Sequence, residues 1–263
     1  MTGSNLRNAE TRAIVTGGSQ GIGFAVARQL VEEGCKAIAL VGRDKDKGAA
    51  AVTKLKALGA EALFISADVS DPASCLRIVD EARERFGTIN GLVNAAATSA
   101  RGSLLETTPD LFDFIYDTNV KGPLFLMQGV VKGLLESGQP GAIVNVLSMS
   151  AHGGQPFLTA YSSSKGALAA LTKNIAYAYR RDRIRCNAVM PGWMDTEGED
   201  TVQKKWHGAS DDWLEKAEAA QPMGQLVKPH QLAMLIAYMI SPQAGVMTGS
   251  LVDYDQNIIG PGD

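Results

Sequence analysis

The residues Thr16-Gly17-Gly18-Ser19-Gln20-Gly21-Ile22-Gly23 decide the fold of this chain. They follow a short apolar run at 13–16 and lead into an amphipathic stretch at 21–33, as expected for a strand, a tight turn and a helix. Glycines in such a turn let a pyrophosphate approach the backbone, and the N-terminus of the helix favours its negative charge. The spacing is GxxxGxG, which differs from the common GxGxxG. We expect a dinucleotide-binding turn made of Gly17, Ser19, Gln20, Gly21, Ile22 and Gly23; the alternative is a turn with no ligand.

The rest of the chain repeats this alternation of short apolar runs with helical patterns. Short, largely apolar runs bounded by Gly, Pro, Asn or Asp are typical of strands buried on both faces of a parallel sheet. We expect strands at 13–16, 37–41, 62–66, 91–94, 142–147, 185–190 and 250–253, and helices at about 21–33, 46–58, 72–86, 109–136, 160–179 and 229–240. This order predicts the α/β class, as a doubly wound Rossmann fold whose seven-stranded parallel sheet has helices on both faces.

The chain has 263 residues and no Pro/Gly/Ser-rich linker, so we expect a single Rossmann-type domain over residues 1–263. One segment, at about 194–228, is too long for an ordinary connection between a strand and a helix. It is polar but carries Trp206, His207 and Trp213. We interpret it as a substrate-loop insertion that forms a lid; the alternative is a surface excursion without function.

Composition excludes several classes of protein. The net charge of −3 does not indicate a nucleic-acid surface. No apolar run approaches the roughly 18–20 residues that span a bilayer, and residues 1–10 have no signal-peptide core. The three cysteines form no CxxC pair and the three histidines have no ligand spacing, so neither a disulfide framework nor a metal site is implied. We expect a cytoplasmic protein with a small-molecule substrate and no nucleic-acid or membrane partner.

The end of the second expected strand, Leu40-Val41-Gly42-Arg43, bears on the choice of dinucleotide. An acidic residue there would hold the ribose 2′-OH of NAD. Gly42 leaves room for a 2′-phosphate and the Arg43 guanidinium matches one, so NADP(H) is favoured over NAD(H). The alternatives are that Arg43 stacks on adenine or is simply solvated, and Asp44 follows at once.

Two further strand ends meet the same edge of the expected sheet. Asp68-Val69 follows the third strand, where Asp68 either contacts the adenine amino group or serves the local turn. Asn94-Ala95-Ala96 closes the fourth strand. Ligands of open α/β sheets bind at this carboxyl edge, so Asp68, Val69, Asn94 and Ala95 are candidate cofactor contacts.

Tyr161 and Lys165 are four residues apart at the start of an expected helix, so their side chains share one face. A tyrosine has a pKa near about 10, and a neighbouring ammonium lowers it. Such a phenol can exchange a proton with a carbonyl or alcohol oxygen. Ser148, at the end of the fifth strand, can hydrogen-bond that oxygen, and Asn119, an amide within an apolar helix, suggests a buried hydrogen-bonding role.

Taken together, these residues resemble the single-domain short-chain dehydrogenases/reductases. The resemblance covers roughly residues 12–253 and is carried by Thr16-Gly17…Gly21-Ile22-Gly23, Asn94-Ala95-Ala96, Asn119, Ser148, Tyr161…Lys165 and Pro191-Gly192…Thr196. Ser148 stands thirteen residues before Tyr161, which is the spacing of the family. Ala96 departs from the family's usual glycine and adds a methyl group at the cofactor edge.

The resemblance implies an NAD(P)-dependent oxidoreductase that transfers hydride to or from a carbonyl or secondary alcohol carbon. It implies Tyr161 as general acid/base and Ser148 as donor to the substrate oxygen. Lys165 would hold the nicotinamide ribose and lower the pKa of Tyr161, and Asn119 would position a water that relays protons. The cofactor set would also include Tyr161, Lys165, Pro191, Gly192, Met194 and Thr196.

The expected substrate pocket is walled by the residues after Ser148, by 95–101, by Trp193 and by the lid. Ser148, His152, Gln155, Trp193 and Trp206 are the candidate substrate contacts. Their polarity suits a sugar, a polyol or another small polar substrate. His152 has an alternative role as a surface-loop histidine.

The segment 247–255 is typical of an edge strand, which needs cover. Family members cover it by pairing, so a homotetramer is expected, with the tail 256–263 near a neighbouring subunit. Two alternative functions stay open: a 3-oxoacyl thioester reductase and a non-catalytic dinucleotide-binding sensor. The first would require a basic patch for an acyl carrier, and none is evident near the lid.

Overall fold

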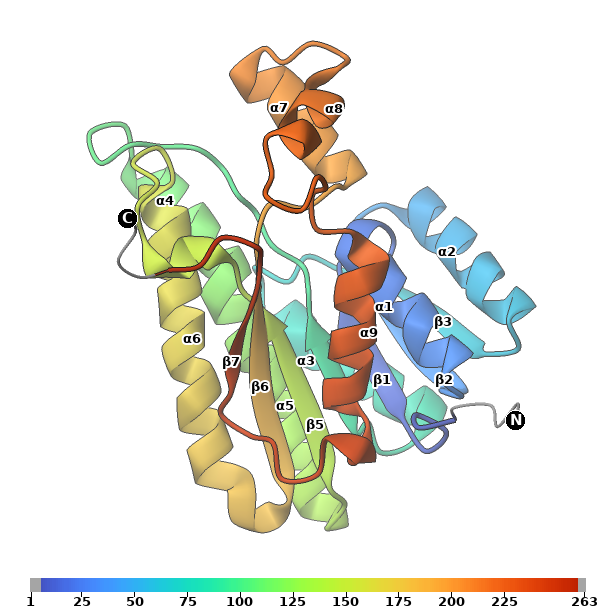
Figure 1. Cartoon of the computed structure of the whole chain (residues 1–263). Helices are drawn as coiled ribbons and strands as arrows, with labels where there is room; N and C mark the ends of the chain where they lie inside the picture. The colour runs from blue at the N-terminus through green and yellow to red at the C-terminus, as the bar shows by residue number, and fades with distance from the viewer. Residues whose placement is uncertain (1–5, 260–263) are drawn as a thin grey trace.

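The computed structural model describes residues 6–259 and contains one sheet of seven parallel strands. The strands lie in the order β3-β2-β1-β4-β5-β6-β7 (Figure 1). Their bounds are β1 Arg12–Thr16, β2 Ala37–Gly42, β3 Glu61–Ser66, β4 Gly91–Asn94, β5 Gly141–Val146, β6 Ile184–Pro191 and β7 Leu251–Tyr254. Each expected strand is present within one or two residues, which confirms the doubly wound Rossmann fold.

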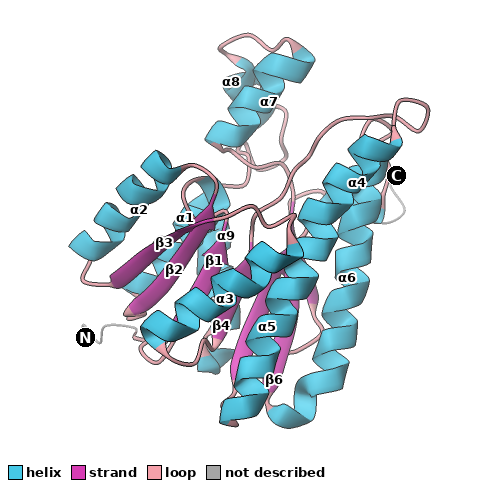
Figure 2. Cartoon of the chain, turned by 180° about the vertical axis from the view of Figure 1, so that it is seen from behind, coloured by secondary structure: helices cyan, strands magenta, loops and turns pink. Residues whose placement is uncertain are grey.

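Helices cover both faces of this sheet. The helices α1 (Gly21–Glu32), α2 (Lys45–Ala57) and α9 (Pro229–Ile240) pack on one face, and α3 (Pro72–Phe86), α5 (Gly122–Ser137) and α6 (Thr159–Tyr179) pack on the other. Figure 1 shows the first layer in front, and Figure 2 shows α3 and α5 from behind. The central strands are buried on both sides because each layer contributes its own apolar cluster.

The helix expected at 109–136 is interrupted, so that prediction was wrong in detail. The structure has α4 (Pro109–Tyr116), a π-helical turn (Asp117–Lys121) and then α5. A π turn inserts an extra residue into a helix and is frequent at functional sites. Asn119 lies within this turn and is buried. At Gly122 a β-carbon would lie 2.4 Å from the Val69 carbonyl oxygen, so α5 begins hard against the chain that follows β3.

The chain leaves β1 and β4 in opposite directions, and the two strands are neighbours in the sheet. Ligands of open sheets bind at such a switch point. The Thr16 hydroxyl at the end of β1 accepts hydrogen bonds from Ala95 N and Ala96 N, each at 3.0 Å. This contact joins the loop after β4 to the last residue of β1, at the switch point.

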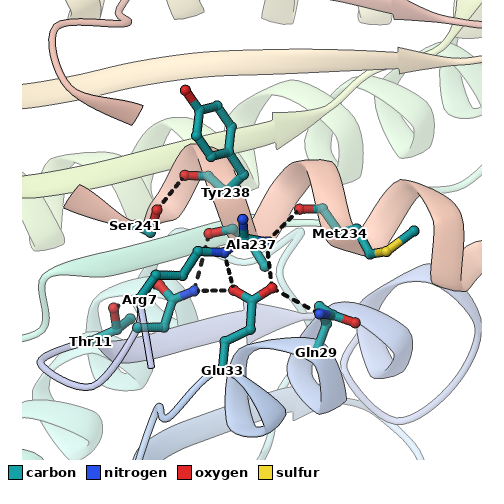
Figure 3. A network of polar contacts seen from close by, with 9 residues as sticks. Arg7, Thr11, Gln29, Glu33, Met234, Ala237, Tyr238 and Ser241 are labelled. Carbon is teal, nitrogen blue, oxygen red and sulfur yellow. Dashed lines mark hydrogen bonds and ion pairs between the residues drawn. The ribbon is translucent and has the colours of Figure 1, made fainter. Parts of the chain in front are cut away.

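A polar network fastens the N-terminal segment to the body (Figure 3). The Glu33 carboxylate is bound by Arg7, by Asn8 Nδ2 at 2.7 Å and by Gln29 Nε2 at 2.8 Å. Asn8 Nδ2 also donates to Ala237 O at 3.2 Å. Since Glu33 follows α1 and Ala237 belongs to α9, the Asn8 side-chain amide ties the segment that carries Arg7 and Asn8 to both helices.

The long connection between β6 and α9 forms two short helices, α7 (Glu197–His207) and α8 (Trp213–Ala219), beyond the carboxyl edge of the sheet (Figure 1). No helix among residues 6–259 is long and apolar enough to cross a membrane. The strand β7 is the outermost strand at one edge, as expected. Residues 260–263 of the expected tail lie outside the described residues. Gln256, at its start, donates to Gln225 O of its own chain at 2.7 Å.

Candidate active site

The glycine turn after β1 is shaped by close backbone approach. Gly17 and Gly21 have φ angles of +64° and +54°, in the left-handed region that favours glycine. At Gly23 a β-carbon would lie 2.3 Å from the Gly17 carbonyl oxygen. Only glycine at position 23 therefore lets α1 begin directly against the turn, with its N-terminal amides facing the crevice.

The turn opens into a cleft with a volume of about 520 Å³. Eleven of the expected cofactor residues line it: Gly17, Ser19, Gln20, Gly21, Ile22, Gly23, Arg43, Asp68, Val69, Ala95 and Thr196. These residues come from the ends of β1, β2, β3, β4 and β6, as the switch point requires. A cradle of glycine backbone beside a helix N-terminus fits the pyrophosphate of NAD(P), which would lie along these residues.

The other expected cofactor residues lie deeper or farther along the edge. Asn94 is buried and donates from Nδ2 to Asn145 Oδ1 at 2.8 Å, so its side chain joins β4 to β5. Gly192 faces Asp255 so closely that a β-carbon would lie 2.1 Å from Asp255 Oδ1. Met194 is buried, and Pro191 is the last residue of β6. Tyr161 and Lys165 lie on α6.

The end of β2 carries two cations, of which the sequence predicted one. Arg43 and Lys47 both line the cleft, and Lys47 Nζ donates to Gln20 Oε1 at 2.7 Å. Asp44 caps α2 by accepting from the backbone of Asp46 and Lys47, each at 3.0 Å. Lys47 was missed because it lies one helical turn beyond the strand end; that spacing is the only signal the sequence carries for it.

Asp68 lines the cleft and also serves its own turn. Its Oδ1 accepts from Ser70 N at 2.9 Å. The second of the two roles weighed for Asp68, local turn chemistry, is therefore present, while its other oxygen stays available at the cleft wall.

Tyr161 and Ser148 meet near this cleft. The α6 helix begins at Thr159, which places Tyr161 in its first turn, and Ser148 caps a short 3-10 turn (Met149–His152) just beyond β5. The Ser148 hydroxyl accepts from Ser150 N at 3.1 Å and lies close enough to the Tyr161 phenol to lower its pKa. Both side chains therefore present oxygen atoms to the same point.

Lys165 lies one helical turn after Tyr161 and is 2% exposed. Its Nζ donates to Val146 O at 2.8 Å and lies 5.7 Å from the centre of the Tyr161 ring. The ammonium is thus held by the last residue of β5, beneath the phenol.

The pKa directions of this pair differ in part from the expectation. Burial raises the pKa of Tyr161 above its ordinary value, although the Ser148 hydrogen bond and the Arg101 charge lower it and the Glu199 charge raises it. Burial lowers the pKa of Lys165 to about 8. Lys165, which was expected to lower the pKa of Tyr161, is not among the causes of its shift; burial of the phenol outweighs the lowering by Ser148 and Arg101.

Asn119 holds the loop after β4 against α6. Its Oδ1 accepts from Thr98 N at 2.9 Å, and its Nδ2 donates to Thr98 O at 2.9 Å and to Ser164 Oγ at 3.1 Å. Its side-chain amide is therefore engaged with protein atoms, and a water held by Asn119 would have to use other atoms of the residue.

The expected substrate residues are divided between the site and its surroundings. Gln155 accepts from the Ser150 hydroxyl, in the segment between Ser148 and Tyr161. His152 Nε2 lies 3.2 Å from Asp253 Oδ1, so the histidine contacts β7. Trp206 is 52% exposed on α7 and has Lys205 over its ring.

Trp193 connects the end of β6 to the lid, which we define as residues 194–228. Its Nε1 donates to Glu199 Oε1 at 2.8 Å, and its ring stacks on Trp213 with centroids 6.0 Å apart. His207, at the end of α7, meets Phe157 edge-to-face at 5.9 Å. Since Phe157 precedes Tyr161 by four residues, the lid reaches across to the segment that carries the tyrosine.

The two ends of the lid form a narrow neck. Met194 and Val227 pair as an isolated parallel bridge, and Asp195 N donates to Val227 O at 3.0 Å. Lys228 closes the neck with ion pairs to Asp195, at 2.8 Å, and to Glu218. The neck fixes both ends of the lid side by side at the carboxyl edge.

Sequence reasoning placed Arg101 only at the edge of the pocket wall and gave Glu199 no role. Both charges act on the Tyr161 phenol, from the loop after β4 and from α7 respectively. Nothing in the pattern of either segment signals this, since it depends on two distant parts of the chain folding over α6.

Comparisons with known proteins agree with this geometry. The family model described as enoyl-(acyl carrier protein) reductase matches residues 17–256. L-rhamnose 1-dehydrogenase (NAD(P)(+)) of Azotobacter vinelandii is 35% identical over 91% of this chain and 94% of its own length.

Two solved structures are similar over nearly the whole fold. L-sorbose reductase of Gluconobacter frateurii, complexed with NADPH and L-sorbose, has a TM-score of 0.86 at 28% identity and covers 93% of this chain and 95% of its own. A variant of actinorhodin polyketide ketoreductase with NADPH has a TM-score of 0.87 at 29% identity and covers 93% and 96%. The chain therefore belongs to the short-chain dehydrogenase/reductase family and is an NAD(P)-dependent oxidoreductase.

Proposed function

We propose that this protein interconverts a secondary alcohol and a carbonyl on a sugar, a polyol or another small polar molecule, with Tyr161 as the general acid/base. The observation that carries the proposal is the Tyr161 phenol beside the Ser148 hydroxyl, with buried Lys165 one turn below. The pocket side of the site is polar, since Glu199, Gln155 and Ser150 lie around it. The rhamnose- and sorbose-directed relatives support the substrate class.

Each residue of the pair has a distinct part in moving the proton. In the reducing direction Tyr161 gives its phenolic proton to the carbonyl oxygen, which Ser148 holds by a hydrogen bond. A raised pKa keeps Tyr161 protonated for this step. Bound NAD(P) supplies or accepts the hydride. Lys165, whose pKa of about 8 lets it exchange protons near neutrality, is the residue from which Tyr161 is reprotonated.

Asn119 supports this path through position. By binding the backbone of Thr98 and the hydroxyl of Ser164 it keeps the loop after β4 next to α6. The relay water expected at Asn119 remains part of the proposal.

For the cofactor we propose a preference for NADP(H) over NAD(H). Arg43 and Lys47 both face the adenosine end of the cleft, where a 2′-phosphate would lie. Asp44, which follows Arg43, is engaged as the cap of α2 and so is less able to compete for a ribose hydroxyl.

A second candidate is reduction of a 3-oxoacyl thioester, which similarity to a polyketide ketoreductase favours. The first turn of α7, at the outer rim of the site, carries Glu197, Glu199 and Asp200. These acidic groups would repel an acidic acyl carrier, so we rank this candidate second. A sensor without turnover is ranked third, because a binder has no use for a proton donor beside the cleft.

We also propose a homotetramer and a cytoplasmic location. The tetramer rests on β7, an edge strand whose residues are only partly covered. The location rests on the three cysteines, each buried as a free thiol, as in proteins of reducing compartments.

The test is Tyr161→Phe, with Tyr177→Phe as the matched control. Tyr177 is on the same helix and is 70% exposed. We expect the first variant to bind NADPH normally and to lose about 10²–10⁴-fold in kcat, and the control to be unchanged. A substrate panel of polyols, sugars and a 3-oxoacyl thioester, run with both cofactors, gives the readout. Full activity of the Tyr161→Phe variant would remove Tyr161 from the mechanism, and tight cofactor binding by the wild type with no turnover would favour the sensor.

A further inference from the structure

Arg101 is held beside the catalytic tyrosine by backbone pairing. Gly102, its neighbour, forms a parallel bridge with Leu158, and Gly102 N donates to Phe157 O at 3.0 Å. Thr159 N returns a bond to Gly102 O at 3.2 Å. These bonds lie just before Tyr161 in the chain, so the loop after β4 is docked onto the start of α6 and its arginine is held near the phenol.

The Arg101 guanidinium has only part of its hydrogen-bonding capacity in use. Its Nη1 donates to Ser99 O at 2.6 Å and to Ser99 Oγ at 3.1 Å. Its Nε is buried and has no hydrogen-bond partner. Among residues 6–259, the ion pairs within 4.0 Å do not include Arg101. A partly buried cation in this condition is unfavourable unless a further partner completes it.

The unused donors have a particular shape. Nε and Nη2 form one edge of the guanidinium, and two parallel N–H groups on that edge match the two oxygens of a carboxylate or a phosphate. Ser99 occupies the other side, which fixes the plane of the group. A carboxylate or a phosphate at this edge would satisfy both the charge and the unpartnered Nε.

We infer that Arg101 binds an anionic group of the substrate, a carboxylate or a phosphate, and so selects polyhydroxy acids or sugar phosphates over neutral polyols. The inference rests on the proposed function, whose substrate class it narrows. Glu199 contributes the negative charge that opposes Arg101 at Tyr161. Its carboxylate is bound by the neutral donors Trp193 Nε1, at 2.8 Å, and Gln203 Nε2, at 2.7 Å, so it can still accept from substrate hydroxyl groups. A substrate with one acidic end and several hydroxyl groups fits both charges.

The alternative is that Arg101 acts only on Tyr161. Its positive charge favours the phenolate and opposes the effect of Glu199. In that case removing the charge would shift the pH profile of kcat and would slow neutral and anionic substrates alike. The two explanations therefore differ in substrate dependence.

The experiment compares D-glucitol, D-gluconate and D-glucitol 6-phosphate, which share one carbon chain, as substrates with NADP⁺. The variants are Arg101→Gln, Arg101→Lys and, as a charge-matched control, Arg28→Gln, whose side chain on α1 is 61% exposed. We expect the wild type to prefer an anionic member by about tenfold or more, and Arg101→Gln to raise KM for that member by about 10–100-fold. The ratio of kcat/KM for that member to kcat/KM for glucitol should fall by the same factor, because any effect of the lost charge on Tyr161 is common to both substrates. Arg101→Lys should retain part of the preference because it keeps the positive charge but not the two parallel N–H groups, and Arg28→Gln should match wild type. Which anion is preferred distinguishes a carboxylate from a phosphate.

Equal losses on neutral and anionic members, or no wild-type preference, would overturn the inference while leaving the proposed function standing. If the wild type turned over neither these three compounds nor any other member of the substrate panel, the proposed function would fail. Calorimetry with gluconate and glucitol 6-phosphate on the enzyme–NADP⁺ complex would then decide the role of Arg101. Weaker binding by Arg101→Gln than by wild type would support it, and equal binding or none would overturn it.

Discussion

The two walls of the site are built by different means. The glycine turn is fixed by backbone contacts, down to the 2.3 Å that separates Gly17 O from a β-carbon at Gly23. The lid is fixed by side chains from distant segments: Trp193 on Trp213, His207 against Phe157, and Lys228 between Asp195 and Glu218. The first wall suits a ligand part that never varies, and the second can be altered one side chain at a time.

The comparison predicts that small changes in the glycine turn have large effects and equal changes in the lid have small ones. Gly23→Ala is expected to weaken NADPH binding by about 100-fold or more, because its β-carbon overlaps the turn. Gly198→Ala, in the lid but also on the cleft, is the control, since the atom nearest its β-carbon is 3.8 Å away. Fluorescence titration with NADPH measures both. Normal NADPH binding by Gly23→Ala would show that the glycine turn tolerates small changes as well as the lid does.

Lys165 lies between the two walls, and its burial makes the stability of the protein depend on pH. Because burial lowers its pKa from 10.5 to about 8, the unfolded chain binds more protons than the folded one between these values. Stability conferred at this position therefore rises as pH increases from about 8 to 10.5, and below about 8 the folded state carries a buried charge. Lys165→Met should stabilise the protein at pH 7 by about 1–3 kcal/mol while abolishing turnover.

Urea denaturation at pH 7 and pH 10 provides the measurement for Lys165. The advantage of the methionine variant should shrink toward pH 10. Lys173→Met, at an exposed position of the same helix, should show no such trend. A pH-independent difference for Lys165→Met would mean that the amine titrates normally in the folded protein.

At the adenosine end of the cleft, we expect substitutions to act by removing positive charge. Arg43→Ala combined with Lys47→Ala is expected to lower kcat/KM for NADP by about 10–30-fold and to leave NAD within about twofold. Lys56→Ala, an exposed change at the far end of α2, should alter neither. A parallel loss with both cofactors would show that these cations do not read the 2′-phosphate.

The smallest effect is expected where Trp193 packs against the lid. Trp193→Phe keeps the ring against Trp213 but removes the hydrogen bond to Glu199, so kcat/KM should fall by about 3–10-fold. Lys216→Ala, on α8 and 68% exposed, is the control. Limited proteolysis of the lid, compared between the two variants, would show whether its closure is weakened. A roughly 100-fold loss of kcat/KM in Trp193→Phe, as large as the loss of NADPH binding expected for Gly23→Ala, would mean that the lid tolerates change no better than the glycine turn.

The same distinction explains what the sequence could predict. The strands, the glycine turn and the order Ser148, Tyr161, Lys165 follow from local pattern, because period, turn residues and helical spacing act within a few residues. The π turn around Asn119 did not, since it depends on where the Thr98 backbone comes to lie. Lys47 was missed because it lies one helical turn beyond the end of β2, and the effect of Arg101 on Tyr161 depends on two distant segments folding together. His152 likewise lies against Asp253, one hundred and one residues away in the chain.

The neck formed by Met194, Asp195, Val227 and Lys228 has a consequence for how such a protein can change. Its two segments enter and leave the lid side by side, so everything between them is a cassette whose ends are already joined by Asp195 and Lys228. A cassette of another length or sequence could be exchanged at this point without altering the register of β6 or the start of α9. Recombination at the neck would then change the substrate specificity by replacing the lid, while the cleft that would hold the cofactor stays as it is.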